Sequence, residues 1–457
     1  MCKVLKEKNL FLFILKEEQN IESKFKIYVM TIVVEEGTIT REDHHGELVK
    51  TPQCLCSWST GIARYIYALI FLTTNLLAWM VRDYGRVALS KLRSMQFILS
   101  SSSLSTVLFV FVFSLIENLE IQGFHSGKEC LGSEGVLRIS LGCFLFFFVM
   151  FVSTVGTRQL GQRRNSWHSS WWSAKIILWM IFMIFPFIIP SDFVLFYGKI
   201  AHLGAGIFLF IQLISVISLI TLLNDYFRMG NNAERCRIQV FVISITAYIV
   251  ALLFIILMYI WYAPNPSCKI NIFFITMTLA LIQLTTFVST LDKVNAGFLT
   301  PGLMAVYLVF ICWCAIRSEP HSENCNKNDG MHSNLMTYIS FVVAVLVIVV
   351  ATFTTGIDSK CFQMIFYFKK VKTETEEDVP YGYGFFHFVF AMGANYFAML
   401  FIGWNTHHTM EKWTIDVGWA STWVRVVNQW LSAVVYLWII VAPLFWKNLR
   451  CPEPQEG

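Results

Sequence analysis

The chain has 457 residues, of which 56% are hydrophobic and only 14% are charged. A soluble domain carries about 25% charged residues, so this composition excludes a soluble protein and indicates one that spans a membrane several times. The net charge of +5 gives no support for nucleic-acid binding. The sequence contains no phosphate-binding glycine loop, no HExxH and no GxSxG, so we expect no catalytic residue, metal or cofactor.

Residues 1–61 precede the first clear span and are expected to form a polar, flexible tail. Leu10–Leu15 is apolar, but it is too short to cross a bilayer, which takes about 20 residues. Thr31–Lys50 is acidic and polar, a composition typical of disorder. Met30 offers a second start site, and the sequence leaves this choice open.

Ten later segments are apolar enough to predict membrane-spanning helices, and Trp or Tyr flanks several of them as at membrane interfaces. They are Ile62–Val81, Val136–Gly156, Ala174–Ile189, Phe193–Asp225, Val240–Tyr262, Ile270–Leu291, Gly302–Ile316, Leu335–Thr354, Phe385–Trp404 and Val427–Trp446. A serine-rich segment, Phe97–Ile116, would make an eleventh, but only its second half is strongly apolar.

The longest segment, Phe193–Asp225, contains no proline. A continuous helix of this length measures roughly 50 Å, whereas the hydrocarbon core of a bilayer is about 30 Å thick. The helix must therefore tilt steeply or project beyond the membrane, which suits a central element. Gly198, Ala201 and Ala205 are small residues that let another backbone approach this helix closely.

The distribution of Lys and Arg predicts the orientation of the chain. These residues favour a cytoplasmic position for the loops at 157–173, 226–239, 292–301 and 355–384 and for the C-terminus. With ten spans the N-terminus is cytoplasmic, and with eleven it is outside, which the charge rule alone prefers. Cys130, Cys268 and Cys325 then face the lumen or exterior, where disulfides form, and their pairing stays open.

A few polar side chains inside apolar segments are candidates for a groove that holds a lipid head group or serine, because a charge at mid-helix costs about 2.5–3.5 kcal/mol. Lys199 and His202 lie on one face of the long helix. Gln212 and Gln283 are candidate polar partners between helices, and Arg138 opens a span. Each has a structural alternative: Lys199 snorkels to the interface, Arg138 anchors there, and the others hydrogen-bond between helices.

Other polar residues carry weaker signals. Asp358 and Asp416, the latter in WTIDVGW, are expected to cap the helices that follow them rather than to catalyse a reaction. His407 and His408 are adjacent, so their side chains diverge and do not predict a metal site. The acidic residues between Glu374 and Asp378 are typical of a solvated loop, with a docking or sorting surface as the alternative.

Several longer phrases resemble the serine incorporator family, most closely its plant members, over roughly residues 54–93 and 129–447. They are ECLGSEGVLRISLGCFLFFFVMF at 129–151, INIFFIT at 270–276, ICWCAIRSEP at 311–320, VPYGYGFFHFVFAMGANYFAML at 379–400 and WTIDVGW at 413–419. The resemblance implies an all-α fold of ten transmembrane helices in two bundles, crossed by one long tilted helix. The position and length of Phe193–Asp225 match that helix.

The chain departs from the family pattern at residues 1–50 and in an atypical insert at 94–128. The insert replaces a short external loop containing cysteine, so Cys130 has lost its usual partner there. Whether the insert spans the membrane or is an error of the gene model stays open. Because the family has a cytoplasmic N-terminus, we expect ten spans rather than eleven, in a domain of residues 62–447 followed by a tail at 448–457.

The resemblance and the polar side chains together predict a non-enzymatic protein that handles lipid. In one mechanism, a polar groove between the bundles passes phospholipid head groups from one leaflet to the other. In another, the protein presents serine to enzymes that make phosphatidylserine and sphingolipids. A membrane-embedded interaction protein is a third alternative. The expected partners are membrane phospholipids and lipid-synthesis enzymes, and the family implies the endoplasmic reticulum, Golgi or plasma membrane.

Overall fold

The computed structural model describes residues 60–92, 131–228, 233–294, 297–320, 334–357, 379–405 and 413–449. Several features predicted from sequence lie outside these residues. They are the tail before residue 60, Phe97–Ile116, Cys130, Cys325, Asp358, the acidic loop residues, and His407 and His408.

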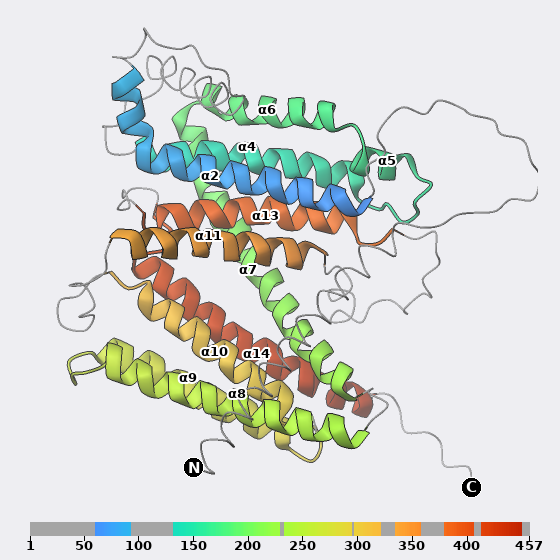
Figure 1. Ribbon diagram of the computed structural model, residues 1–457, viewed down its shortest axis with the longest axis vertical. Helices are drawn as coiled ribbons and strands as arrows, with labels where there is room; N and C mark the ends of the chain where they lie inside the picture. Colours follow the sequence, from blue (N-terminus) through green and yellow to red (C-terminus); the bar gives the residue numbers. More distant parts are fainter. Residues whose placement is uncertain are drawn as a thin grey trace, which may run out of the picture. The chain divides into compact units, whose positions relative to one another are not determined.

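The described part of the chain is built of eleven helices and contains no β-strand (Figure 1). They are α2 (Thr60–Leu92), α4 (Leu131–Thr154), α5 (Arg163–Ser169), α6 (Trp172–Ile188), α7 (Ser191–Arg228), α8 (Ala233–Tyr262), α9 (Lys269–Thr290), α10 (Leu299–Arg317), α11 (Asn334–Ile357), α13 (Tyr383–Ile402) and α14 (Trp419–Leu449). The predicted all-α class is therefore confirmed.

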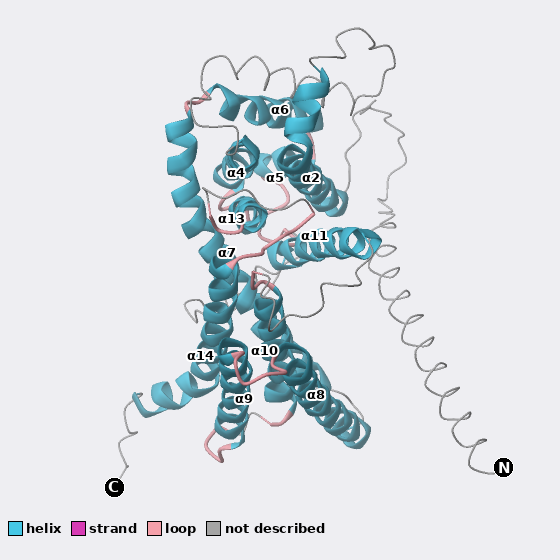
Figure 2. Cartoon of the chain, turned by 90° about the vertical axis from the view of Figure 1, so that its left-hand side faces the viewer, coloured by secondary structure: helices cyan, strands magenta, loops and turns pink. Residues whose placement is uncertain are grey.

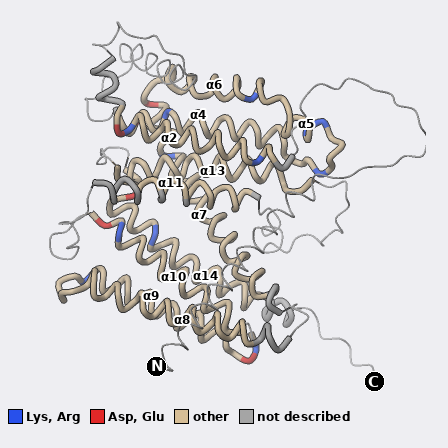
Figure 3. Tube along the Cα trace, viewed as in Figure 1, with Lys and Arg blue, Asp and Glu red and all other residues tan. Residues whose placement is uncertain are grey.

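Eight of these helices are long and apolar enough to cross a membrane, and a ninth span follows if α5 and α6 count as one broken span. The two helices of that pair meet at 68°. Each of the ten predicted spans falls on a described helix. Two of these helices do not meet the length criterion alone, because α6 has 17 residues and the apolar part of α11 covers only Ala344–Gly356. Figure 3 shows most described charged residues near helix ends, as expected for a polytopic membrane protein.

The helices form two groups, and each group has its own core of buried side chains (Figure 1). The first group contains α2, α4, α6, α11 and α13, and the second contains α8, α9, α10 and α14. Figure 2 looks nearly along the axes of the first group and shows α13 surrounded by α4, α2, α11 and α7. Almost every residue of α13 is buried, which makes it the central helix of that group.

The helix α7 contributes to both cores. Its buried residues from Val194 to Ile211 belong to the first core, and those from Leu213 to Ile220 belong to the second. Gln212 lies at the change from one core to the other. The predicted long helix that crosses two bundles is therefore present, and it is five residues longer than predicted, at 38 residues.

Small residues set the close approach of α7 to α13. Ala201 and Ala205 are fully buried, as their spacing predicted. At Gly204, a Cβ atom would lie 2.1 Å from Nδ2 of Asn395 on α13, so no larger residue fits without movement. Asn395 is held in turn by the Tyr197 hydroxyl, which donates to its Oδ1 at 2.6 Å. The first half of α7 is therefore packed against α13 without spare room.

Candidate functional site

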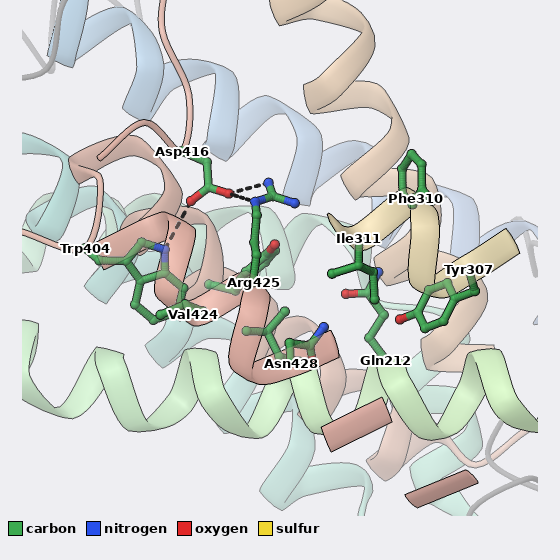
Figure 4. Close-up of a pocket in the computed structure, with 11 residues that line it drawn as sticks. Gln212, Tyr307, Phe310, Ile311, Trp404, Asp416, Val424, Arg425 and Asn428 are labelled. Atoms are coloured by element: carbon green, nitrogen blue, oxygen red, sulfur yellow. Dashed lines mark hydrogen bonds and ion pairs between the residues drawn. The ribbon is translucent and has the colours of Figure 1, made fainter. Parts of the chain in front are cut away.

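A cavity of about 100 Å³ lies where the two helix groups meet (Figure 4). It is lined by α7, α10, α13, the segment after α13, and the first turns of α14. The lining residues are Leu209, Gln212, Tyr307, Phe310, Ile311, Tyr396, Trp404, Asp416, Val424, Arg425 and Asn428. Because its walls come from both groups, a change in their relative packing would change the cavity.

Asp416 and Arg425 form the charged centre of this cavity (Figure 4). The Arg425 Nε donates to Asp416 Oδ2 at 2.5 Å, and Nη2 pairs with the same oxygen. The indole Nε1 of Trp404 donates to Asp416 Oδ1 at 3.2 Å. The exposed fraction is 4% for the Asp416 side chain and 27% for that of Arg425. The carboxylate is thus enclosed by its partners, while part of the guanidinium is reachable.

The backbone that carries Trp404 and Asp416 is unusual. Both residues have positive φ, at 59° and 56°, a conformation that costs of order 1–3 kcal/mol for residues other than glycine. The Asp416 N–H donates to the Leu400 carbonyl at 2.9 Å, and the Gly418 N–H donates to the Ser318 carbonyl at 2.8 Å. The segment is therefore fixed to the ends of α13 and α10, one helix from each group.

The prediction that Asp416 caps the following helix is wrong. The helix α14 begins at Trp419, and the Thr422 N–H donates to the Gly418 carbonyl, so the first turn starts two residues after Asp416. The predicted span started at Val427, whereas the helix starts eight residues earlier. Arg425 therefore lies within α14 and not in an outer loop. A single charge in the apolar stretch WVRVVNQW is the signal that could have identified it.

Two of the predicted groove residues lie at or beside the cavity. Gln212 lines it directly. His202 is half-buried, with Nδ1 2.7 Å from the Gly198 carbonyl oxygen and Nε2 3.2 Å from that of Trp404. A neutral imidazole donates only one of these two bonds, and a protonated one donates both. His202 therefore positions the Trp404 backbone, whereas Lys199 is exposed on α7 and does not line the cavity.

The other two predicted groove residues lie elsewhere. Gln283 is exposed on α9 and is not part of the cavity lining. Arg138 is 4% exposed and forms an ion pair of 2.6 Å with Glu134. It also donates to the carbonyls of Pro186 and Ile189, at 2.5 and 2.7 Å. The predicted interfacial anchor is thus a buried arginine that holds the connection between α6 and α7.

The cysteines separate into two kinds. Cys268, one of the three predicted disulfide candidates, is disulfide-bonded, and the other two, Cys130 and Cys325, lie outside the described residues. Cys143, Cys312 and Cys314 are free thiols in the helices. No described group of His, Cys, Asp or Glu has the arrangement of a metal site.

A second polar cluster, which the sequence did not predict, lies inside the first helix group. His168 on α5 lies 3.0 Å from His387 on α13 through Nδ1 and Nε2, and its own Nε2 lies 2.9 Å from the Tyr381 hydroxyl. The Lys175 Nζ and the Tyr67 hydroxyl both donate to the His168 carbonyl, at 2.7 and 3.0 Å. Aromatic rings cover this cluster, with the Tyr383 ring stacked on that of His168.

Together, the helices and the charged cavity between two helix groups define an integral, multi-pass membrane protein. The serine incorporator family model matches residues 48–367 and 367–449, so the chain belongs to this family. It is 25% identical to a probable serine incorporator of Dictyostelium discoideum, over 68% of this chain and 80% of that protein. It is also 25% identical to a probable serine incorporator of Monosiga brevicollis, over 86% of this chain and 91% of that protein. Serine incorporator 3 of Mus musculus is 23% identical, over 69% of this chain and 80% of the relative.

Proposed function

We propose that this protein moves phospholipids between the two leaflets of a membrane without catalysing a covalent reaction. The lipid head group passes the cavity at Asp416 and Arg425. The observation that carries this proposal is the ion pair itself, because it lies inside a membrane protein and lines a cavity between two helix groups. Ionisable residues in such positions are costly, and they mark the paths of polar substrates.

The chemistry of the cavity lining supports transfer of a polar head group. Arg425 offers a planar set of N–H donors that suits a phosphate. The side-chain amides of Gln212 and Asn428, which also line the cavity, offer both donors and acceptors. The lining contains no Ser, Cys, His or Lys side chain, and its one carboxylate, Asp416, is already engaged by Arg425 and Trp404. Binding and passage suit this set of residues better than catalysis.

The first half of α7 extends the proposed path beyond the cavity. His202 precedes Gln212 on this helix by about three turns and contacts the Trp404 backbone. Lys199 is exposed one turn earlier, where its ammonium group is available to a lipid phosphate. In this proposal Lys199 and His202 contact the lipid head group first, and the head group then passes through the cavity.

The test is scrambling of fluorescent phospholipids in liposomes that hold the full-length protein, measured as loss of leaflet asymmetry without ATP. Gln212→Leu and Asn428→Leu each remove a polar group from the cavity and leave the ion pair in place. We expect rates on the order of tenfold slower, equal to about 1.4 kcal/mol in the barrier. Gln283→Leu is the matched control, because Gln283 is an exposed glutamine on α9, and its rate should equal that of wild type.

The absence of scrambling by folded wild-type protein would contradict the proposal. It would favour the second candidate function, in which the protein presents serine to lipid-synthesis enzymes. The relatives' name, serine incorporator, points to this function for them. An equal decrease of the scrambling rate in Gln283→Leu and Gln212→Leu would show that the cavity has no specific role in scrambling. The plant-type relationship and the organelle remain predictions.

A further inference from the structure

The cavity is rich in aromatic rings as well as charge. Tyr307 and Phe310 enter the lining from α10, Tyr396 from α13, and Trp404 from the segment after it. Tyr396 is almost fully buried, and its ring lies 6.4 Å from that of Trp404, edge to face. Aromatic faces attract cations, and cages of such rings are a recurrent way to bind quaternary ammonium groups.

The balance of charge favours a ligand with no net charge. The charged side chains among the lining residues are one carboxylate, Asp416, and one guanidinium, Arg425. They neutralise each other, so the cavity has no excess charge to balance that of an anionic head group. Placing an unbalanced charge in a region of low dielectric is costly. A zwitterionic head group adds no net charge, and it can align its phosphate with Arg425 and its cation with Asp416.

The hydrogen bonds of Asp416 distinguish between two kinds of cation. Trp404 donates to its Oδ1, and Arg425 donates to its Oδ2, so the carboxylate already has a donor at each oxygen. A primary ammonium group brings three N–H donors that all need acceptors. A trimethylammonium group needs none and is stabilised by ring faces and by the nearby negative charge. The site therefore suits choline better than ethanolamine or serine.

The guanidinium of Arg425 is placed for the other half of the head group. It carries five N–H donors, and Asp416 engages only those on Nε and Nη2. The Arg425 side chain is 27% exposed, and it lines the cavity. A cavity of about 100 Å³ has room for a small head-group moiety.

We propose that the cavity selects the phosphocholine head group, with the trimethylammonium group against the aromatic rings, near the negative charge of Asp416, and the phosphate on Arg425. This inference rests on the proposed function, since it assigns the lipid class of the same site. The phosphocholine group occurs on both glycerophospholipids and sphingolipids, and the chemistry of the cavity does not distinguish the two backbones.

The test is competitive lipid binding to the delipidated, full-length protein in detergent, measured by native mass spectrometry. The probes are dihexanoyl phosphatidylcholine, phosphatidylethanolamine and phosphatidylserine, with a short-chain sphingomyelin as the second source of phosphocholine. We expect the two choline lipids to bind about equally, and each roughly tenfold more tightly than the ethanolamine and serine lipids. Tighter or equal binding of phosphatidylserine would overturn the proposal.

A pair of variants separates recognition from folding. Tyr307→Phe keeps a ring in the lining, and Tyr307→Leu removes it. The Leu variant should lose the preference for choline over ethanolamine by about fivefold, whereas the Phe variant should retain it. Because the readout is a ratio of two lipids, partial loss of folded protein does not affect it. An unchanged ratio in both variants would overturn the role of the rings.

The outcomes also separate this proposal from the proposed function. Scrambling of all head groups together with equal binding of all head groups would overturn the choline preference alone. Selective choline binding by a protein that scrambles nothing would overturn the transfer function and support a choline-lipid site.

Discussion

Two polar clusters in the described part of this protein differ in their residues and in their surroundings. In the first helix group, His168, His387 and Tyr381 are joined by short hydrogen bonds and covered by rings. At the junction of the two groups, Asp416 and Arg425 are paired in the wall of a cavity. The His168 ring system is sealed, whereas the guanidinium of Arg425 can be reached.

This difference separates polar groups that hold helices together from polar groups that are available to a ligand. The His168 cluster joins the neighbouring helices α5 and α6 to α2 and to the start of α13, which lie far from them in sequence. Burial raises the pKa of the Tyr381 hydroxyl, so this group remains a neutral partner. The ion pair instead connects a strained segment to α14 beside open space. We therefore expect changes in the first cluster to alter stability and changes in the second to alter transport.

The largest effect should come from breaking the ion pair. Arg425→Leu leaves the Asp416 carboxylate buried without its charged partner, which should cost about 3–5 kcal/mol of unfolding free energy. The double variant with Asp416→Leu removes both charges and should recover at least half of that stability, while transport stays absent. Denaturant unfolding in detergent and the liposome assay measure the two effects. Equal instability of the single and double variants would contradict the pairing.

The next effect compares the face of α7 that contacts α13 with a face of the same helix that has open space. Gly204→Leu places a side chain where a Cβ already meets Asn395, and it should destabilise the crossing of α7 and α13 by about 3 kcal/mol. Gly206→Leu on the same helix is the control, because no atom outside its own helix lies within 4 Å of a Cβ there. Similar thermal midpoints for the two variants would show that α7 is not packed as described.

A smaller effect is expected in the sealed cluster. His387→Leu removes the partner of the His168 Nδ1, and an unsatisfied buried group costs about 2 kcal/mol. Transport per folded molecule should remain at the wild-type level. The comparison is His202→Leu, which should lower transport with a smaller loss of stability, because His202 is half-buried and contacts the Trp404 carbonyl. Lower transport in His387→Leu together with unchanged transport in His202→Leu would contradict the division into a structural cluster and a transport site.

The smallest effect concerns the pH dependence of stability at Glu319, just after the end of α10. Burial raises the pKa of Glu319 to about 7, although a hydrogen bond with Asn271 acts against this. A pKa that is higher in the folded state than in the unfolded state means that the folded protein binds this proton more tightly. The stabilisation is therefore complete below about pH 4.5 and is lost as the pH rises through about 7.

The variant Glu319→Gln cannot ionise and isolates this contribution. Between pH 5 and pH 8, wild type should lose on the order of 1–2 kcal/mol relative to the variant, measured from unfolding in detergent at both values. Glu319 follows Ser318, whose carbonyl holds the Gly418 N–H, so the same pH range should also slightly alter transport. Parallel pH profiles of the two proteins would exclude the titration.

The helices could be predicted from the sequence pattern, whereas their grouping into two bundles was implied only by the resemblance to the serine incorporator family. Apolar length alone located every described long helix, because a membrane-spanning helix must be apolar over most of its length. The central role of the long helix followed from its length in the same way. Helix ends were less certain, since hydropathy changes gradually at the interface, and this is why α14 was expected to start at Val427 and not at Trp419.

The candidate site was only partly predictable. Gln212 was identified because a glutamine in an apolar helix is conspicuous, and it lines the cavity. Arg425 lies just before the predicted span at Val427–Trp446, so hydropathy does not place it in a helix, and the sequence predicts Asp416 as a cap. Their pairing depends on the positive φ of Asp416 and on contacts between segments distant in sequence, neither of which a hydropathy pattern contains. His168 and His387 likewise meet across 219 positions of the chain.

The central position of α13 has a consequence for the order in which the protein is made. Most of the first helix group has been synthesised once the ribosome reaches residue 211. Its innermost helix, α13, starts only at Tyr383, after α8, α9 and α10 have been synthesised. At about 5–20 residues per second, the ribosome needs roughly 10–35 s to cover that interval. During this time α2, α4 and α7 lack the helix against which they pack in the complete chain. Helpers that shield unpaired helices during membrane insertion would therefore be needed most between these two points.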